Sequence, residues 1–303
     1  MANTCQQLIA TGITALLGQT DSPELDAELL LSKAIGQSRA WLLAYQDEIV
    51  SDEDVETFQS LLQRRASGEP IAYIFGEREF WSLPFTVNNA VLIPRPDTEA
   101  LVEAVLEHCS TRLAPSNKEN ETASTLQLLD LGTGSGAIAI ALASELKKLA
   151  ELNFSITAVD QSSQAIEVAQ LNAKRNAVEN TIRFHHGSWF APINSEHFDI
   201  IASNPPYIAE NDQHLQQGDV RFEPVSALTS GIDGLQDIHH IAQQAPNHLN
   251  DNGILFLEHG FQQGKSVQAI LKACGFHEIQ TIDDYSGNPR VTFGIWQDKR
   301  SAS

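Results

Sequence analysis

The sequence predicts a doubly wound α/β fold with a mostly parallel sheet, preceded by a small helical bundle. Two observations carry this prediction. From residue 126 onward, short apolar segments alternate with helical patterns, as they do in open α/β sheets. A glycine-rich loop also separates the first of these apolar segments from its helix, and such loops bring backbone close to ligands.

The N-terminal part, residues 1–69, is expected to hold four short helices. Asp21-Ser22-Pro23-Glu24 has the cap and the early proline of a helix start. Ser51-Asp52-Glu53-Asp54 opens another helix with an acidic first turn. Apolar residues recur at helical spacing after both starts. This bundle is either a stabilising appendage or a module that docks a partner protein, and the sequence alone favours neither.

Residues 70–92 are predicted to form a linking β-hairpin, because aromatic and β-branched residues replace the helical pattern there. Residues 93–303 make up the larger domain. Its first helix starts at Ile93–Glu99 and runs to about Arg112, and the polar residues 114–125 are expected to form a surface loop.

The larger domain is expected to hold seven strands joined mainly by helices. The strands are predicted at residues 126–131, 154–160, 181–185, 199–203, 253–258, 279–283 and 290–296. Helices are predicted at residues 137–149, 163–176 and 265–274. The last two strands follow each other closely, so we expect them to form a hairpin.

The charge of the chain argues against nucleic acid as a partner. The sequence has 19 Lys and Arg against 39 Asp and Glu, which gives a net charge of −20. Binding to a phosphate backbone normally needs a basic surface. A basic protein is a better partner for so acidic a chain.

The cysteines and the termini indicate a cytoplasmic protein without a metal site. Cys5, Cys109 and Cys274 lie far apart and are odd in number, which is typical of reduced thiols. No Cys or His pair has metal-ligand spacing. The N-terminus lacks the cationic start of a signal peptide, and no apolar run has membrane-spanning length.

The glycine loop predicts a nucleotide-like cofactor. Asp130-Leu131-Gly132-Thr133-Gly134-Ser135-Gly136 lies between a strand and a helix, and Asp160 ends the next strand, where an acid can accept bonds from ribose hydroxyls. The loop alone fits either NAD or S-adenosylmethionine. Asp130 disfavours a pyrophosphate but suits a cationic sulfonium, and Trp189 offers a flat surface for adenine.

Asn204-Pro205-Pro206-Tyr207 follows the fourth strand and predicts a site for an –NH2 group. The prolines end the strand and lock the backbone, while Asn204 supplies an amide acceptor and Tyr207 an aromatic wall. The carboxyl edge of the sheet brings this segment to the glycine loop. The cofactor and the –NH2 group would therefore meet at this edge of the sheet.

The glycine loop followed by Asn204-Pro205-Pro206-Tyr207 resembles class I methyltransferases that act on planar nitrogens. More narrowly, three segments resemble the PrmC/HemK family, namely residues 93–99 (IPRPDTE), 214–224 (HLQQGDVRFEP) and 257–260 (LEHG). Members of that family methylate the side-chain amide nitrogen (N5) of the glutamine in the Gly-Gly-Gln motif of class 1 peptide chain release factors. The resemblance covers nearly the whole chain and implies a Rossmann-like, mostly parallel seven-stranded sheet.

The resemblance also implies the roles of site residues. S-adenosylmethionine, with S-adenosylhomocysteine as its product, would be held by Gly132, Thr133, Gly134, Ser135, Gly136, Asp160, Trp189 and Asn204. The substrate glutamine would be bound by Asn204, Pro205, Pro206 and Tyr207, with Asn204, Pro205 and Tyr207 as the catalytic residues. Relatives often carry an acid where this chain has Ser188. The implied partner is a class 1 release factor, with no nucleic acid or membrane, and we expect a monomer.

The sequence assigns supporting roles to other residues and argues against other functions. Glu258 and His259 are interpreted as a packed pair at a strand end, and Arg95 and Glu99 as braces of the pocket. Asn-Pro-Pro-Tyr also occurs in methyltransferases of adenine N6 or guanine N2, which the charge of −20 disfavours. A non-catalytic cofactor-binding adaptor has no use for Asn204. An NAD-dependent dehydrogenase is disfavoured by Asp130 and by the lack of a placed proton donor.

Overall fold

The computed structural model of this protein describes residues 3–112, 125–149, 152–216 and 218–297. The chain divides into two compact units. The first comprises residues 1–77 together with 213–222, and the second comprises residues 78–212 and 223–303. The sequence analysis placed residues 213–222 in the larger domain, so the first unit is less contiguous than expected. The expected loop over 114–125 lies, except for its last residue, outside the described ranges.

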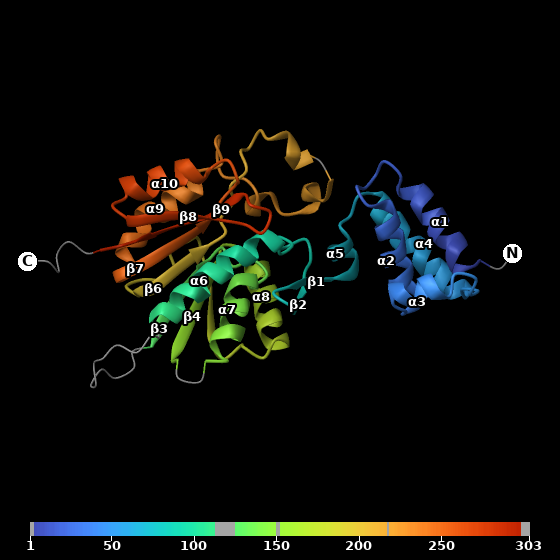
Figure 1. The fold of residues 1–303 in the computed structure, drawn as a ribbon, viewed down its shortest axis with the longest axis horizontal. Coiled ribbons are helices and arrows are strands. Elements are labelled where there is room, and N and C mark those ends of the chain that lie inside the picture. Colours follow the sequence, from blue (N-terminus) through green and yellow to red (C-terminus); the bar gives the residue numbers. More distant parts are fainter. Residues whose placement is uncertain (1–2, 113–124, 150–151, 217, 298–303) are drawn as a thin grey trace, which may run out of the picture. The chain divides into compact units, whose positions relative to one another are not determined.

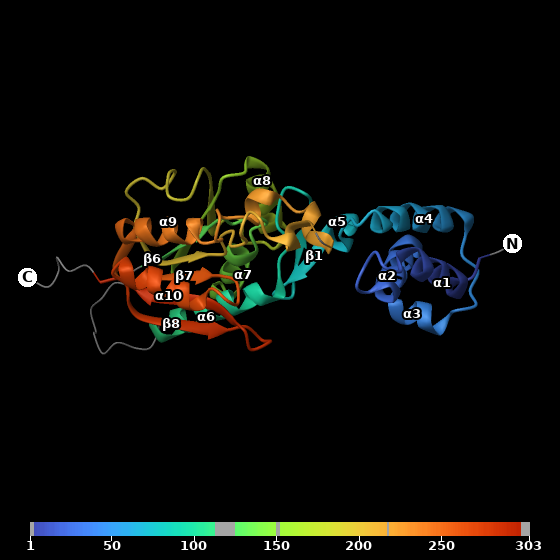
Figure 2. The same ribbon diagram turned by 90° about the horizontal axis from the view of Figure 1, so that it is seen from above.

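The first unit is built mainly from helices (Figure 2). Thr4 and Gln7 form a reciprocal capping box at the first helix, and Ser51 caps the fourth by accepting a bond from Asp54 N. A β-carbon at Gly12 would lie 2.9 Å from Ala27 Cβ, so glycine permits the close approach of the first two helices. The helices are α1 (Cys5–Leu16), α2 (Pro23–Ile35), α3 (Arg39–Ala44), α4 (Asp52–Ala66) and α5 (Ile71–Phe75).

A buried arginine joins the late segment 213–222 to these helices. The Arg65 Nε donates to Asp26 Oδ2 on α2 at 2.7 Å, and its Nη1 donates to Asp219 Oδ1 at 2.7 Å. Asp219 lies on the 3₁₀ helix η3 (Gly218–Phe222). Both Arg65 and Asp26 are buried. A buried charge is costly without a partner, and here each charge has an opposite charge at hydrogen-bonding distance.

The expected hairpin is shorter than the sequence analysis proposed. Strands β1 (Glu77–Phe80) and β2 (Leu83–Thr86) pair with each other, and Trp81 and Ser82 form the turn with positive φ of 54° and 56°. Residues 71–75 are helical instead of extended, which corrects the prediction for that stretch. Pro70 precedes this single turn, and Gly76 ends it in the left-handed conformation. Its aromatic and β-branched composition had favoured a strand.

The second unit contains the predicted seven-stranded sheet (Figure 1). Its strand order is β5-β4-β3-β6-β7-β9-β8. Strand β9 runs opposite to the other six strands, so its pairings with β7 and β8 are antiparallel. The central strands are apolar because both of their faces are covered. The strands are β3 (Leu126–Leu131), β4 (Phe154–Asp160), β5 (Ile182–His186), β6 (Phe198–Ser203), β7 (Leu249–Glu258), β8 (His277–Asp283) and β9 (Pro289–Ile295).

Helices pack on both faces of this sheet. Helices α9 (Gln236–Gln244) and α10 (Gly264–Ala273) share one buried core with alternate residues of β3, β6 and β7. Helices α6 (Glu99–Arg112), α7 (Ala137–Leu146) and α8 (Ser163–Arg175) contact one another in sequence. Helix α9 was not predicted from the sequence. Within the described residues, no helix combines the length and the apolar character that a membrane span requires.

Candidate active site

The glycine loop after β3 turns over the end of β4. The backbone N–H groups of Gly132 and Thr133 both donate to Val159 O, at 2.9 and 3.0 Å. Gly132, Gly134 and Gly136 have φ of 73°, 55° and 85°, a region that favours glycine. The loop is therefore held by backbone contacts and leads directly into α7.

Asp130 braces this loop from a buried position. Its Oδ2 accepts bonds from the Thr133 hydroxyl at 2.7 Å and from Ala139 N at 3.2 Å, while its Oδ1 has no partner among the described residues. Burial raises the pKa of Asp130 to about 7, although these two bonds oppose the shift. Asp130 does not line the cavity described below. The structure thus gives it a bracing role, whereas the sequence analysis expected it to face a cationic ligand.

Asp160 ends β4 with both carboxylate oxygens bound to backbone. Its Oδ2 accepts from Gly134 N and its Oδ1 from Ser162 N, each at 2.8 Å. Burial raises the pKa of Asp160, and the two backbone bonds lower it in part. Each oxygen keeps a further lone pair, so the carboxylate can still accept hydroxyl donors from a ligand.

Trp189 packs against the glycine loop. Its backbone has a φ of 46°, which is uncommon for a bulky residue. A β-carbon at Gly132 would lie 3.5 Å from Trp189 Cζ3, so the ring stands directly beside the loop backbone. Ser188, the departure noted from the family pattern, is exposed next to it. The indole and the loop together form one wall of a cavity.

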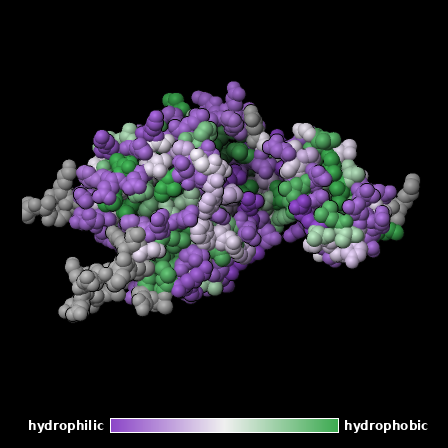
Figure 3. Space-filling model, viewed as in Figure 1, coloured by the Kyte–Doolittle hydropathy of each residue, from purple (hydrophilic) through white to green (hydrophobic). Residues whose placement is uncertain are grey.

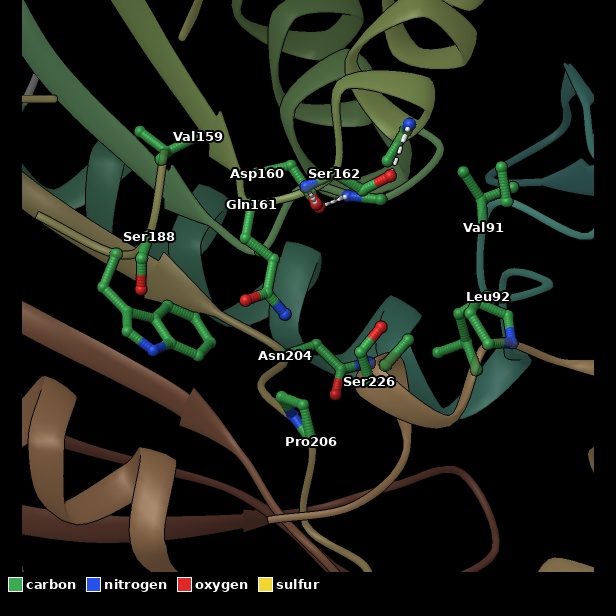
Figure 4. Close-up of a pocket in the computed structure, with 17 residues that line it drawn as sticks. Val91, Leu92, Val159, Asp160, Gln161, Ser162, Ser188, Asn204, Pro206 and Ser226 are labelled. Carbon is green, nitrogen blue, oxygen red and sulfur yellow. Dashed lines mark hydrogen bonds between the residues drawn. The ribbon is translucent and has the colours of Figure 1, made fainter. Parts of the chain in front are cut away.

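This cavity lies at the carboxyl ends of β3, β4 and β6, where open α/β sheets bind ligands. About 670 Å³ there is not filled by atoms, a volume that includes space open to solvent. In Figure 4, Asp160 and Ser162 lie on one side of it and Asn204 and Pro206 on another. Six predicted site residues line it together, namely Gly132, Gly134, Asp160, Trp189, Asn204 and Pro206.

The remaining predicted site residues lie around this cavity without lining it. Thr133 and Ser135 are buried within the loop, and Gly136 is the residue before α7. Pro205 is buried and Tyr207 partly buried behind Asn204 and Pro206.

Several lining residues were missed by the sequence analysis. They come from segments far apart in the chain, namely Ala90, Val91, Leu92, Gln161, Ser162, Ser226 and Ala227. Glu223 brings two of these segments together. Its Oε2 accepts from Ile93 N at 3.2 Å, and its Oε1 forms an ion pair with Arg95. Ile93 and Arg95, from one family-like segment, thus meet Glu223, from another, through a buried carboxylate.

The side chain of Asn204 is held by one hydrogen bond. Its Nδ2 donates to Thr98 Oγ1 at 3.1 Å, and no other hydrogen bond of this side chain occurs within the described residues. Thr98 belongs to the 3₁₀ turn before α6 and is buried. The Asn204 Oδ1 therefore keeps its acceptor capacity at the cavity wall.

Tyr207 is fixed at both ends of the residue. Its hydroxyl donates to Glu258 Oε1 at 3.4 Å, and its carbonyl accepts from Gln263 Nε2 at 3.0 Å. A β-carbon at Gly234 would lie 2.2 Å from Tyr207 O, so only glycine fits against this backbone. Burial and the nearby Glu258 raise the pKa of Tyr207. The Tyr207 phenol therefore stays neutral, so its hydroxyl can donate to Glu258 while its ring packs as an apolar surface.

Arg95 pairs with Glu223, as described above. The Glu99 carboxylate accepts from Trp81 N at 2.9 Å and so braces the turn of the hairpin, whereas it was expected to brace the pocket. His259 is buried, and its ring nitrogens are engaged with Thr292 Oγ1 and Gly260 O. This supports its interpretation as a packed residue.

Two family models match the chain. The model described as the PrmC N-terminal domain matches residues 7–76, and the model described as the methyltransferase small domain matches residues 106–222.

Curated relatives align with nearly the whole chain. A release factor glutamine methyltransferase of Aliivibrio fischeri is 46% identical over 98% of this chain and 99% of its own length. A protein of the same name from Vibrio cholerae is 47% identical over 93% of both chains. The Escherichia coli protein of that name is 45% identical over 92% of this chain and 94% of its own.

A similarity to solved structures bears on the fold alone. The catalytic domain of hMettl16 in complex with MAT2A 3'UTR hairpin 1 has a TM-score of 0.52 at 12% identity. It covers 83% of this chain and 86% of that chain. Identity this low carries no statement about the substrate.

Proposed function

Because this chain belongs to the family of release factor glutamine methyltransferases, we propose that the cavity beside Asn204 is where it carries out this reaction. The enzyme transfers a methyl group from S-adenosylmethionine to the side-chain amide nitrogen of the release-factor glutamine in the Gly-Gly-Gln motif. The observation that supports our placement is that Asn204 lines the same cavity as the glycine loop and Asp160.

The cavity fits the cofactor chemically. Gly132 and Gly134 let backbone approach a ligand without a side chain, Asp160 offers free lone pairs to ribose hydroxyls, and Trp189 offers an apolar plane to adenine. We propose that these residues hold S-adenosylmethionine, with Thr133, Ser135 and Gly136 shaping the loop beneath them. When bound, the cofactor supplies an electrophilic methyl group and leaves as S-adenosylhomocysteine.

The substrate amide needs help, because its nitrogen lone pair is delocalised into the carbonyl. We propose that Asn204 Oδ1 and the Pro205 carbonyl each accept one N–H of the glutamine –NH2 group. Positive charge grows on this nitrogen during transfer, so fixed acceptor dipoles stabilise the transition state more than the ground state. Pro206 stiffens the segment and Tyr207 packs behind it. The attack needs no general base, and the methylated amide then loses a proton to water.

The first unit is proposed to dock the release factor. Figure 3 shows apolar patches among hydrophilic surface on the visible face of this unit. Large apolar side chains of the unit stand exposed, including Leu43 at 57%, Ile49 at 65% and Leu17 at 62%. Contiguous exposed apolar patches are typical of protein interaction sites. We further propose that the enzyme acts as a cytoplasmic monomer, and its three free cysteines support that location.

Labelled methyl transfer tests the function. The purified protein is offered S-adenosylmethionine with a class 1 release factor, with the same factor lacking the Gly-Gly-Gln glutamine, and with mixed DNA and RNA. We expect label on the intact factor alone. Label that persists without the glutamine would contradict the substrate atom, and label on nucleic acid would favour an exocyclic amino-group methyltransferase instead.

A further inference from the structure

The segment Asn204-Pro205-Pro206-Tyr207 has few backbone groups with which it can be held in place. Pro205 and Pro206 carry no N–H, so neither can donate a hydrogen bond. Each proline also fixes its own φ and restricts the residue before it, so few torsions between Asn204 and Tyr207 are free. A displacement at Tyr207 is therefore passed along the segment to the Pro205 carbonyl and to Asn204.

The peptide unit between Tyr207 and Ile208 anchors the far end of this segment. On one edge, Tyr207 O accepts from Gln263 Nε2 at 3.0 Å. On the other edge, Ile208 N donates to Leu228 O at 2.9 Å. A peptide unit is planar, so two bonds on opposite edges fix its tilt, whereas a single bond leaves it free to rotate about that bond. The Gln263 amide thus completes the anchor.

We propose that Gln263 is a positioning residue that acts through the Tyr207 carbonyl and aims Asn204 and the Pro205 carbonyl at the substrate –NH2 group. The inference rests on the proposed function, in which these two groups accept the amide hydrogens of the glutamine. Gln263 does not line the cavity, so it acts on the transfer only through this segment.

The Gln263 side chain is turned away from its own helix. Gln263 is the residue before α10, and no side-chain hydrogen bond caps that helix among the described residues. Its Oε1 instead accepts from Gly260 N at 2.9 Å, while its Nε2 reaches Tyr207 O and, at 3.4 Å, Asp233 O. A backbone N–H requires an acceptor and a carbonyl requires a donor. The backbone on both sides therefore determines that the –NH2 end of Gln263 faces Tyr207.

A glycine contacts the same hydrogen bond. A β-carbon at Gly234 would lie 2.2 Å from Tyr207 O and 3.0 Å from Gln263 Nε2. The backbone of Gly234 therefore packs directly on the Tyr207 carbonyl and its donor. A substitution at Gly234 offers a second way to displace this carbonyl.

Two substitutions at Gln263 test the positioning role. Gln263→Glu keeps an oxygen for Gly260 N but removes the donor to Tyr207 O, and Gln263→Met removes both polar groups. With a saturating release factor, we expect each variant to lower the single-turnover rate about tenfold, because displaced acceptors no longer meet the substrate N–H groups. The KM for the release factor and the affinity for S-adenosylmethionine should each change less than about threefold, whereas general damage to the fold would change them as well.

Two other glutamines serve as matched controls. Gln262→Glu adds the same charge at the exposed neighbouring residue. Gln268→Met removes another half-buried amide of this region, one that donates to Thr281 Oγ1 at 2.8 Å. Both variants should transfer the methyl group at the wild-type rate. A Gln263→Glu variant of wild-type rate beside a slow Gln263→Met variant would show that only the bond from Gly260 matters, which contradicts the positioning role.

Gly234→Ala should lower the single-turnover rate as the Gln263 variants do, because its β-carbon would meet the Tyr207 carbonyl. Gly287→Ala is its control, since Gly287 has a similar φ, 79° against 74°, and a β-carbon there would have no atom within 4 Å. It should keep the wild-type rate. Thermal unfolding shows which variants fold, and the Gln263 variants decide the question if Gly234→Ala does not fold.

The outcomes distinguish the two proposals. A wild-type protein that labels the release factor, together with a Gln263→Glu variant of wild-type rate, overturns the positioning role and leaves the proposed function standing. Losses in Gln262→Glu or Gln268→Met equal to those at Gln263 also overturn it, because they show an effect of charge or of packing. A wild-type protein that does not label the glutamine overturns the proposed function and the positioning role with it.

Discussion

The carboxylate of Asp160 accepts a hydrogen bond from the backbone N–H of Gly134 at 2.8 Å. This bond ties the end of β4 to the glycine loop after β3. One acid therefore both shapes the loop and offers its remaining lone pairs to the cavity. In the proposed complex with S-adenosylmethionine, loop geometry and cofactor binding would be coupled through this one side chain.

Asp160→Ala is accordingly expected to weaken S-adenosylmethionine binding by at least about tenfold, because it removes two loop bonds and the ribose acceptor together. Titration calorimetry measures the affinity. Asp283→Ala, an exposed acid at the end of β8, serves as the matched control and should bind normally. Wild-type affinity in Asp160→Ala would refute the assigned role.

Asn204→Ala should lower the transfer rate about 100-fold, the scale seen when one fixed polar group is removed from a transition state. S-adenosylmethionine affinity should change less than about threefold, since Asn204 forms only one part of the cavity wall. Single-turnover kinetics and calorimetry separate the two effects. An unchanged single-turnover rate would contradict the proposed role of Asn204 as an acceptor for the substrate amide.

Asn172 carries a prediction about stability. It is fully buried on α8, and its Nδ2 donates to Ser135 O at 2.9 Å and to Thr86 O at 3.0 Å. Its Oδ1 accepts from Thr86 N at 2.7 Å. Asn172→Leu leaves these three backbone groups without their partner, so we expect a loss of about 3 kcal/mol in the free energy of unfolding.

Denaturant unfolding monitored by circular dichroism measures this loss. Asn176→Ala is the control, because the half-buried Asn176 makes a comparable bond to Pro84 O at the end of the same helix. It should cost less than about 1 kcal/mol. Equal losses of unfolding free energy in both variants would show that the Asn172 bonds between the glycine loop and the hairpin contribute no more to stability than the bond of Asn176.

Glu258 carries a prediction about pH. Burial raises the pKa of Glu258 from 4.5 to about 7, so the folded state binds this proton more tightly than the unfolded state. The contribution of the protonated Glu258 carboxyl to the free energy of unfolding is therefore complete below pH 4.5, and it is lost as the pH rises to about 7. Glu258→Gln should gain stability relative to wild type across this window and keep a constant advantage above it. Melting temperatures of both proteins between about pH 5 and pH 8 test this, and a constant difference would contradict it.

Docking through the first unit predicts a substrate-dependent defect. Leu43→Asp and Ile49→Asp place charges at exposed apolar positions and should lower kcat/KM on the whole release factor about tenfold. A short peptide with the Gly-Gly-Gln motif should be methylated at the normal rate. Leu171→Asp, which is 52% exposed on α8 of the other unit, is the control. Equal defects on both substrates would indicate a scaffold role only.

The sequence predicted the strands of the sheet better than the helices that flank them. β3 and β4 match their predicted bounds, because each is an apolar run that ends at a glycine or an acid. Helix α9 was missed because its sequence is rich in Gln and His and buries only Ile238, Ile241 and Ala242. Helix α5 was missed because its neighbours, and not its β-branched residues, determine its conformation.

Six of the seventeen residues that line the cavity could be predicted from the sequence. The glycine loop, Asp160 and Asn204 lie at strand ends, where topology alone brings them to one edge. The opposite wall depends on Glu223, which binds Ile93 N across 130 residues of chain. Local pattern carries no signal for such a long-range bond. The bond between Asn204 and Thr98, 106 residues apart, was invisible for the same reason.

The bond between Arg65 and Asp219 also affects how the chain is made. The two residues are 154 positions apart, so Arg65 leaves the ribosome long before its partner exists. Until then, Asp26 and the Glu69 carbonyl are the partners that the described residues of the earlier chain offer this guanidinium. A fragment that stops at residue 77 would keep Arg65 in this immature state permanently. The first unit is therefore not one continuous stretch of the sequence. A gene truncated at the apparent linker would not encode the complete unit.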